Sequence, residues 1–110
     1  MASKYHNEKV TINGEVFDSK KEARRYQFLL LLQKAGQINN LKRQVKYVLV
    51  PVQYIGGKCV ERAVTYTSDF EYDKPTGEHI VEDCKGYRTD VYKLKKKLML
   101  HKFGIRILET

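Results

Sequence analysis

The chain lacks the patterns that mark membrane, secreted and zinc-binding proteins. No apolar run approaches the ~20 residues of a membrane-spanning helix, and the N-terminus has no apolar signal-peptide core. Only two cysteines are present, Cys59 and Cys84, and neither stands in the Cys-x-x-Cys or Cys/His spacing of a zinc site. We therefore expect a reduced, cytoplasmic setting and no membrane partner.

Motifs that read a nucleic-acid sequence are also missing. The chain has no helix-turn-helix, zinc-finger or RNP-like aromatic motif, so sequence-specific readout is not indicated. It has no internal repeat and no long linker either, and its 110 residues fit a single domain over residues 1–110, with residues 1–8 expected to be loose.

Positive charge, in contrast, is abundant. The net charge is +8 and the pI is near 9.5, a balance that favours a polyanion as partner. Hydrophobic residues make up 42% of the chain, which is enough to form a core and excludes a disordered tail. A basic, folded domain that binds nucleic acid by charge and shape is the class that composition favours.

Local patterns predict a simple order of elements. Asn13-Gly14 predicts a hairpin over 10–17, and Ser19 caps a helix that ends near Gly36. Residues 37–43 are interpreted as a connector. The remaining elements are strands over 45–52, 59–72 and 79–85, a helix over 90–102 and a strand over 105–109, with a turn at Gly56-Gly57. The order hairpin–α–β–β–β–α–β predicts an α/β fold whose mixed, mostly antiparallel sheet is flanked by helices.

The two helices are expected to bury different amounts of surface. Four leucines in a row, at positions 29–32, predict that the first helix is buried on more than one side. In the second helix, Val91, Leu94, Leu98 and His101 lie along one stripe, which is interpreted as its packing face.

The stretch from Ala63 to Gly86 contains the residues that are best suited to bind a metal ion or to catalyse a reaction. Asp69 lies on one expected strand, and Asp83 and Lys85 share a face of the next. Two carboxylates brought together by strand pairing repel each other unless a cation lies between them, and Mg²⁺ is the hard cation that carboxylate oxygens suit. An acid followed on the next strand by acid-x-Lys therefore predicts a cation site with a lysine beside it.

The acids of this region also have purely structural interpretations, as does Glu22 at the start of the first helix. Glu22 fits the third position of a capping box after Ser19. Asp69 and Asp83 could each pair with a lysine and do nothing more. Glu82, next to Asp83, could compete for the metal or serve as a salt-bridge partner. These alternatives stay open at this level.

The order of elements, with Asp69 and Asp83-x-Lys85, resembles that of the PD-(D/E)XK nuclease superfamily, although Ser68 stands where proline or alanine is common before the first aspartate. The resemblance implies a restriction-endonuclease-like core and a metal-dependent endodeoxyribonuclease. It implies that Glu22, Asp69, Asp83 and Lys85 are catalytic. It also implies that Mg²⁺, with Mn²⁺ as a substitute, is held by Asp69, Asp83, Glu22 and the backbone carbonyl of Cys84.

A closer resemblance covers nearly the whole chain, from residues 4–6 through 17–23 to the last strand. It is to small phage and prophage proteins, several of which are similar to Holliday junction resolvases. This resemblance implies a homodimer that cuts branched or structured DNA in the bacterial cytoplasm, in phage or prophage DNA metabolism. Two alternatives remain: a non-catalytic DNA-binding protein, and a nuclease subunit that needs a phage partner.

Basic side chains outside the site are candidates for phosphate contacts. Many lysines simply face solvent, but those of the second helix follow directly from the strand that carries Asp83. The expected DNA contacts are Lys20, Lys21, Arg24, Arg88, Lys93, Lys96 and Lys97. No organic cofactor is expected.

Overall fold

The computed structural model of the protein describes residues 9–85 and 87–110. The expected loose segment over 1–8 and Gly86 lie outside the described residues. The elements are β1 (Val10–Ile12), β2 (Glu15–Phe17), α1 (Lys20–Lys34), β3 (Asn39–Arg43), β4 (Lys46–Val50), β5 (Gln53–Ile55), β6 (Lys58–Glu61), β7 (Val64–Thr67), β8 (Phe70–Asp73), β9 (His79–Asp83), α2 (Asp90–Phe103) and β10 (Leu108–Glu109).

The N-terminal hairpin and α1 form where the sequence predicts them. Asn13 and Gly14 both take positive φ, 52° and 80°, as a two-residue hairpin turn requires. The Ser19 hydroxyl oxygen accepts a hydrogen bond from the Glu22 N–H at 3.2 Å, which caps the first turn of α1. Gly36, with φ 77°, follows the end of the helix. The hairpin, the cap and the stop are all confirmed.

Strands β3 to β8 form one long hairpin that bends twice and turns at Gly56-Gly57. From its base to its tip, β3 pairs with β8, β4 with β7 and β5 with β6, all antiparallel. The prediction that 37–43 is a connector is wrong, because β3 is held by pairing with β8 although its sequence is polar. The single strand expected over 59–72 is divided into three, because the hairpin bends where the ladders end.

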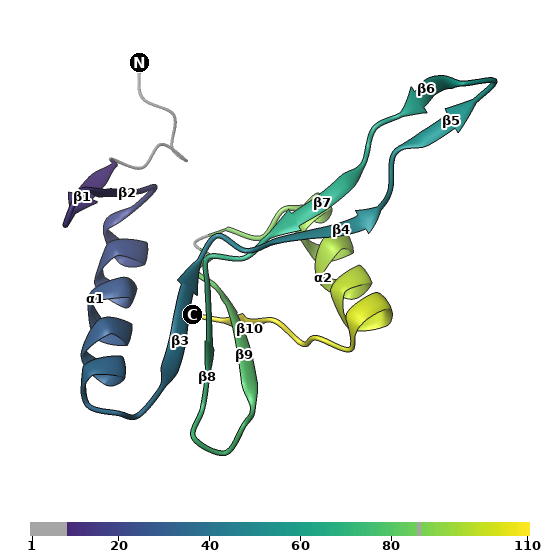
Figure 1. The fold of residues 1–110 in the computed structure, drawn as a ribbon. Helices are drawn as coiled ribbons and strands as arrows, with labels where there is room; N and C mark the ends of the chain where they lie inside the picture. Colours follow the sequence, from purple (N-terminus) through teal and green to yellow (C-terminus); the bar gives the residue numbers. More distant parts are fainter. Residues whose placement is uncertain (1–8, 86) are drawn as a thin grey trace.

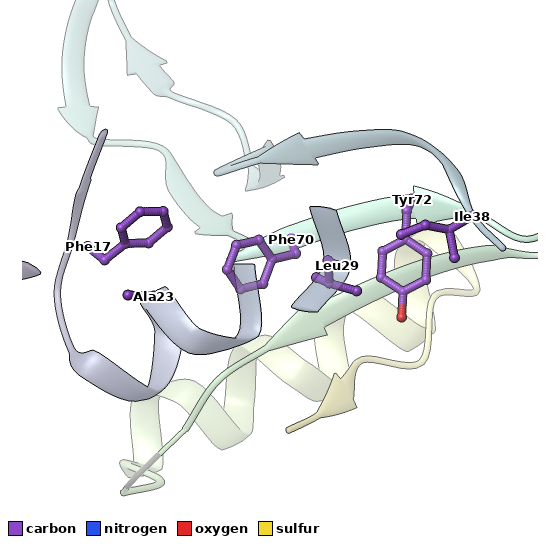
Figure 2. Packing of buried hydrophobic residues seen from close by; sticks show 6 residues of the cluster. All are labelled: Phe17, Ala23, Leu29, Ile38, Phe70 and Tyr72. Atoms are coloured by element: carbon purple, nitrogen blue, oxygen red, sulfur yellow. The ribbon is translucent and has the colours of Figure 1, made fainter. Parts of the chain in front are cut away.

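The central sheet has the strand order β10-β9-β8-β3, with β10 parallel to β9 and the other pairs antiparallel. The mixed, mostly antiparallel α/β sheet is therefore confirmed. Helix α1 and helix α2 lie on either side of this sheet (Figure 1). On the α1 side, Phe70 and Tyr72 of β8 pack with Leu29 and Phe17 (Figure 2). On the α2 side, the buried cluster comprises Leu49, Tyr66, Val81, Tyr92, Met99 and Ile107.

Helix α1 is buried on fewer sides than expected, and α2 buries a different face from the one expected. In α1 only one face is covered, since Leu29 is fully buried while Leu31 is 64% exposed. In α2 the buried residues are Tyr92 and Met99, two turns apart, and Val91 and Leu94 of the predicted stripe are exposed. The face of α2 that carries Tyr92 is therefore the one that packs near the end of β9.

The tip of the long hairpin projects away from the rest of the chain (Figure 1). All residues from 51 to 62 are exposed, and the ladder of β5 and β6 carries only the turn at Gly56-Gly57. We call residues 51–62 the arm. Within residues 9–85 and 87–110, no helix is long and apolar enough to cross a membrane.

Candidate active site

Asp69 lies at the break between β7 and β8. At this break the Ser68 N–H donates to the Val45 carbonyl at 2.9 Å, and the Asp69 N–H donates to the Glu82 carbonyl at 3.0 Å. The chain thus changes partner strand between two successive residues. The Asp69 carboxylate accepts a hydrogen bond from the Cys84 N–H at 2.7 Å, which places it beside the end of β9. The bend in the hairpin is therefore what brings the two predicted acids together.

Asp83, the last residue of β9, is 1% exposed. Its Oδ2 accepts a hydrogen bond from the Tyr66 hydroxyl at 2.6 Å. Its Oδ1 is buried and accepts no hydrogen bond within the part of the chain that the structure describes, although the Lys85 ammonium lies 3.3 Å from it as an ion pair. One oxygen of this buried carboxylate is thus held by an ion pair alone, which leaves it able to accept a further positive ligand.

Glu22 reaches the same place from the first turn of α1. Its side chain is buried, and one carboxylate oxygen accepts from the Asp18 N–H at 3.1 Å. It also hydrogen-bonds Asp69. Burial, this hydrogen bond to Glu22 and the negative charge of Asp83 together raise the pKa of Asp69 to about 8, although the Cys84 N–H pulls that pKa down. The structure therefore places Glu22 both at the helix start and against the predicted acid pair.

Lys85 continues from β9 beside the acids. Its ammonium lies 4.7 Å from the centre of the Tyr92 ring of α2, so it is held between a carboxylate and an aromatic face. Lys21 donates to the Lys85 carbonyl at 3.3 Å, which brings one predicted basic residue of α1 to the site. The thiol of Cys84 points to Thr110 at 3.1 Å, and burial raises its pKa to about 11, so this residue offers only its backbone.

Glu82 is a salt-bridge partner and lies on the opposite face of β9 from Asp83. Arg25 of α1 donates to both of its carboxylate oxygens, at 2.8 and 2.6 Å, and the Tyr72 hydroxyl donates as well. The hydrogen bonds to Glu82 raise the pKa of Arg25 further. Every oxygen of Glu82 is therefore satisfied within the protein.

A second acidic cluster forms on β8 and the start of β9. The buried Glu71 accepts from the Tyr47 hydroxyl at 2.6–2.7 Å and from the Ser68 hydroxyl at 2.8 Å. One nitrogen of His79 lies 2.7 Å from Glu71 and the other lies 2.7 Å from Asp73. Hydrogen bonds to Asp73, and then to Glu71, raise the pKa of His79. The carboxylates of this cluster are thus hydrogen-bonded by partners within it.

The acids near Asp83 suit a hard divalent cation by their chemistry. Across residues 9–85 and 87–110, no three or more His, Cys, Asp and Glu side chains stand in the arrangement of a formed metal site. Asp69 and Glu22 instead share a hydrogen bond with each other, and Asp83 keeps one oxygen without a hydrogen bond. Carboxylate oxygens that face each other in this way fit Mg²⁺, which would take up the charge that now raises the pKa of Asp69.

A family model described as "Protein of unknown function (DUF1064)" matches residues 2–107. The chain belongs to the DUF1064 family. No curated protein and no solved structure matches it. In this DUF1064 chain the family match covers both helices and every residue of the candidate site, so the acids and Lys85 all lie within the family's own domain.

The basic residues predicted to contact DNA do not form one surface in this DUF1064 chain. Arg88, Lys93, Lys96 and Lys97 surround a cavity beside α2. Lys20 and Arg24 line a smaller, separate hollow between α1 and β1. Lys21 alone of the α1 group reaches the candidate site, through the Lys85 carbonyl.

The sequence interpretation missed three residues that the structure adds. Tyr66 and Tyr92 contact Asp83 and Lys85, and Arg106 joins the basic residues beside α2. Tyr66 lies two residues after Val64 in a run of β-branched and aromatic residues, a pattern that predicts only a strand. Its distance of 17 residues from Asp83 carries no local signal.

Proposed function

We propose that the protein is a metal-dependent DNA endonuclease that hydrolyses phosphodiester bonds. The observation that supports this best is the meeting of Asp69, Asp83 and Lys85 at the broken end of the sheet, with one buried oxygen of Asp83 lacking a hydrogen bond. A buried carboxylate whose second oxygen has only a lysine for a partner, beside another buried acid, is typical of a site that binds a cation. The likeness of Asp69 and Asp83-x-Lys85 to the PD-(D/E)XK motif agrees with this proposal.

In the proposed site, each residue has a role that follows from its chemistry. Asp69, Asp83, the Cys84 carbonyl and Glu22 would hold Mg²⁺ or Mn²⁺. Such an ion supplies an activated water and stabilises charge on a phosphate. Lys85, with its ammonium fixed 3.3 Å from Asp83 Oδ1, orients the attacking water or balances charge on the scissile phosphate. Tyr66 and Tyr92 hold Asp83 and Lys85 in position.

The proposed substrate is DNA, branched or otherwise structured, and the proposed setting is phage or prophage DNA metabolism in a bacterial cytoplasm. The net charge of +8 supports a polyanionic substrate. Junction cutting requires two symmetric cuts, so the resemblance to junction resolvases supports a homodimer.

A second candidate is a DNA-binding protein without catalysis of its own, or a nuclease subunit that needs a partner protein. The observation that favours it is that Glu22 and Asp69 already hydrogen-bond the Asp18 and Cys84 N–H groups. These carboxylates would have to give up or share those bonds on binding an ion. This candidate predicts binding with a steep salt dependence and no cleavage by the isolated chain.

The test is cleavage of four-way junction, flap, duplex and single-stranded DNA with Mg²⁺ or Mn²⁺, for wild type, Asp83→Ala and Asp73→Ala. Asp73 is the matched control acid. It lies at the end of β8 away from Asp69, where it contacts Asn40 and His79. The proposal expects cleavage by wild type and Asp73→Ala and a loss of at least ~100-fold in Asp83→Ala. Equal cleavage by both variants would exclude this site, and binding without any cleavage would favour the second candidate.

A further inference from the structure

A cavity of about 650 Å³ lies between α2 and the segment that contains β10. Its rim carries five cations, Arg88, Lys93, Lys96, Lys97 and Arg106. Among the lining residues that the structure describes, Glu109 is the single acid, so the cations exceed the carboxylate by four charges, half of the net +8 of the chain. A volume of this size is in the range that encloses a nucleotide-sized ligand. The charge of the rim selects an anion.

Glu109 keeps part of this rim in place. Arg88 lies 2.8 Å from its carboxylate and Lys96 lies 3.3 Å from the same oxygen. The Tyr92 hydroxyl donates to the other oxygen at 2.8 Å. A carboxylate held by an arginine, a lysine and a tyrosine hydroxyl stands where a phosphate oxygen would be recognised by the same donors. The cations are thus already oriented toward an anion.

The cavity also has an apolar wall, which phosphate recognition alone does not need. Leu100, Ile107 and the ring of Tyr92 form it. Ile107 and Tyr92 are buried beneath the surface, whereas Leu100 is 53% exposed. A paired duplex offers its outer phosphates and sugars to such a cavity, while its base faces stay stacked. An unpaired nucleotide offers a phosphate to the rim and a base to the wall.

The cavity adjoins the candidate active site through one side chain. The Tyr92 ring lies under the Lys85 ammonium at 4.7 Å, and its hydroxyl reaches Glu109. Glu109 is also paired with Asp83 across β10 and β9. A strand that lies in the cavity is therefore close to Asp83 and Lys85.

We propose that this cavity binds an unpaired segment of the nucleic-acid strand that leads into the candidate active site. The inference rests on the proposed function and deepens it, because it names single-stranded character next to the cut as the feature that the protein recognises. The backbone is held by Lys93, Lys97 and Arg106, and a base contacts Leu100. Arg88 and Lys96 exchange Glu109 for a phosphate.

The test measures binding of a fluorescent 12-nucleotide oligo(dT) and of a 12-base-pair duplex by anisotropy, in EDTA so that no cleavage occurs. The variants are Lys93→Ala with Lys97→Ala, and Leu100→Ala, all at exposed positions of α2. The double variant Lys34→Ala with Lys95→Ala is the matched control, because neither lysine lines the cavity and the charge lost is the same.

The double cavity variant is expected to bind oligo(dT) about tenfold more weakly, with a salt slope lower by roughly 1.4, while the control stays within about twofold. Leu100→Ala is expected to weaken oligo(dT) about fivefold and leave the duplex unchanged. Glu109→Gln is expected to tighten oligo(dT). Equal effects of the control and cavity pairs, or equal loss of duplex and single strand in Leu100→Ala, would overturn the inference.

A second experiment measures how well a poly-glutamate peptide of matched charge competes with oligo(dT) for the protein. The proposal expects it to displace oligo(dT) only at a large excess, because it has no base to meet Leu100. Displacement at equal charge would overturn the proposal in favour of an acidic protein segment. These binding results do not depend on cleavage, so a failed nuclease assay and a failed cavity assay are distinguishable.

Discussion

Glu82 and Asp83 are adjacent residues of β9, and both are almost completely buried, yet their surroundings are opposite. Glu82 faces α1, where Arg25 and the Tyr72 hydroxyl satisfy both of its oxygens. Asp83 faces the other side, with one oxygen on the Tyr66 hydroxyl and the other held by the Lys85 ammonium alone, without a hydrogen bond in the described chain. The first arrangement is a structural ion pair. The second has unused capacity for a positive ligand.

The same contrast is repeated between Glu71 of β8 and Asp69, which immediately precedes that strand. Glu71 has hydrogen-bond partners in Tyr47, Ser68 and His79. Asp69, two residues earlier, has the Cys84 N–H and is otherwise set against other carboxyl groups, which raise its pKa. Burial of an acid is therefore no guide to its role in this protein. What separates structural acids from candidate site acids is whether the fold itself supplies enough donors and cations.

The largest expected effect on stability tests the contrast between Glu82 and Asp83 on β9. In metal-free buffer, Glu82→Gln is expected to lower the free energy of unfolding by about 2–4 kcal/mol, because it leaves the charge of Arg25 without its partner. The side chain of Arg25 is 25% exposed, which keeps this cost below that of a fully buried pair. Asp83→Asn retains an acceptor for Tyr66, and the ion pair that it loses with the partly exposed Lys85 is offset by relief of the repulsion between Asp83 and Asp69, so stability is expected to change by less than about 1 kcal/mol. Urea denaturation measures both.

If both substitutions cost the same, Asp83 is as firmly built into the fold as Glu82, and the distinction fails. Cleavage assays on the same two proteins provide the second reading. The proposed function expects activity in folded Glu82→Gln and loss of activity in Asp83→Asn.

A smaller effect, of opposite sign, is expected at Asp69. Its pKa is about 8 in the folded protein against an ordinary value of 3.8, so the fold favours the neutral acid. The stabilisation that comes from this preference for the neutral acid is fully present below pH 3.8 and is lost as the pH rises through about 8. In EDTA, Asp69→Asn is therefore expected to be more stable than wild type by about 1–3 kcal/mol at pH 8, with a difference that shrinks toward pH 5. Parallel stability curves across this range would show that Asp69 is not strained.

The smallest effect concerns His79, where acids are satisfied. Because Asp73 and Glu71 raise its pKa above the ordinary 6.5, its contribution is present below pH 6.5 and is lost as the pH rises through the folded value. The ring is 46% exposed, so the loss is expected to stay below ~1 kcal/mol. The contribution of His79 is isolated by measuring the free energy of unfolding of Asp69→Asn with and without His79→Gln, at pH 6 and at pH 9. A difference that grows toward pH 9 would contradict the assignment.

Much of the fold could be predicted because its signals are local. Asn13-Gly14, the Ser19 cap and the Gly56-Gly57 turn each depend on the chemistry of a few adjacent residues. Strand β3 could not be predicted in this way, since Asn39-Asn40-Leu41-Lys42-Arg43 has no apolar alternation and is ordered by β8. The packing face of α2 was missed for a similar reason, because the neighbouring strands decide which side is covered.

The candidate site divides in the same manner. The sequence indicates that Asp83 and Lys85 share a face, and the bend between β7 and β8 and the first turn of α1 place Asp69 and Glu22 beside them. The open question about Glu82 needed tertiary information, since Arg25 lies 57 residues away in the chain. The cavity beside α2 also depends on Arg106 and Glu109 of the last segment meeting the lysines of α2.

The long hairpin suggests an order of events during folding. Its three ladders share the turn at Gly56-Gly57, so pairing that starts in the arm can extend to β4–β7 and then to β3–β8. Each extension closes a short loop, which costs less entropy than joining β3 to β8 directly across the intervening residues. We therefore expect the arm, the least buried part of the folded chain, to be where the register that positions Asp69 is first set.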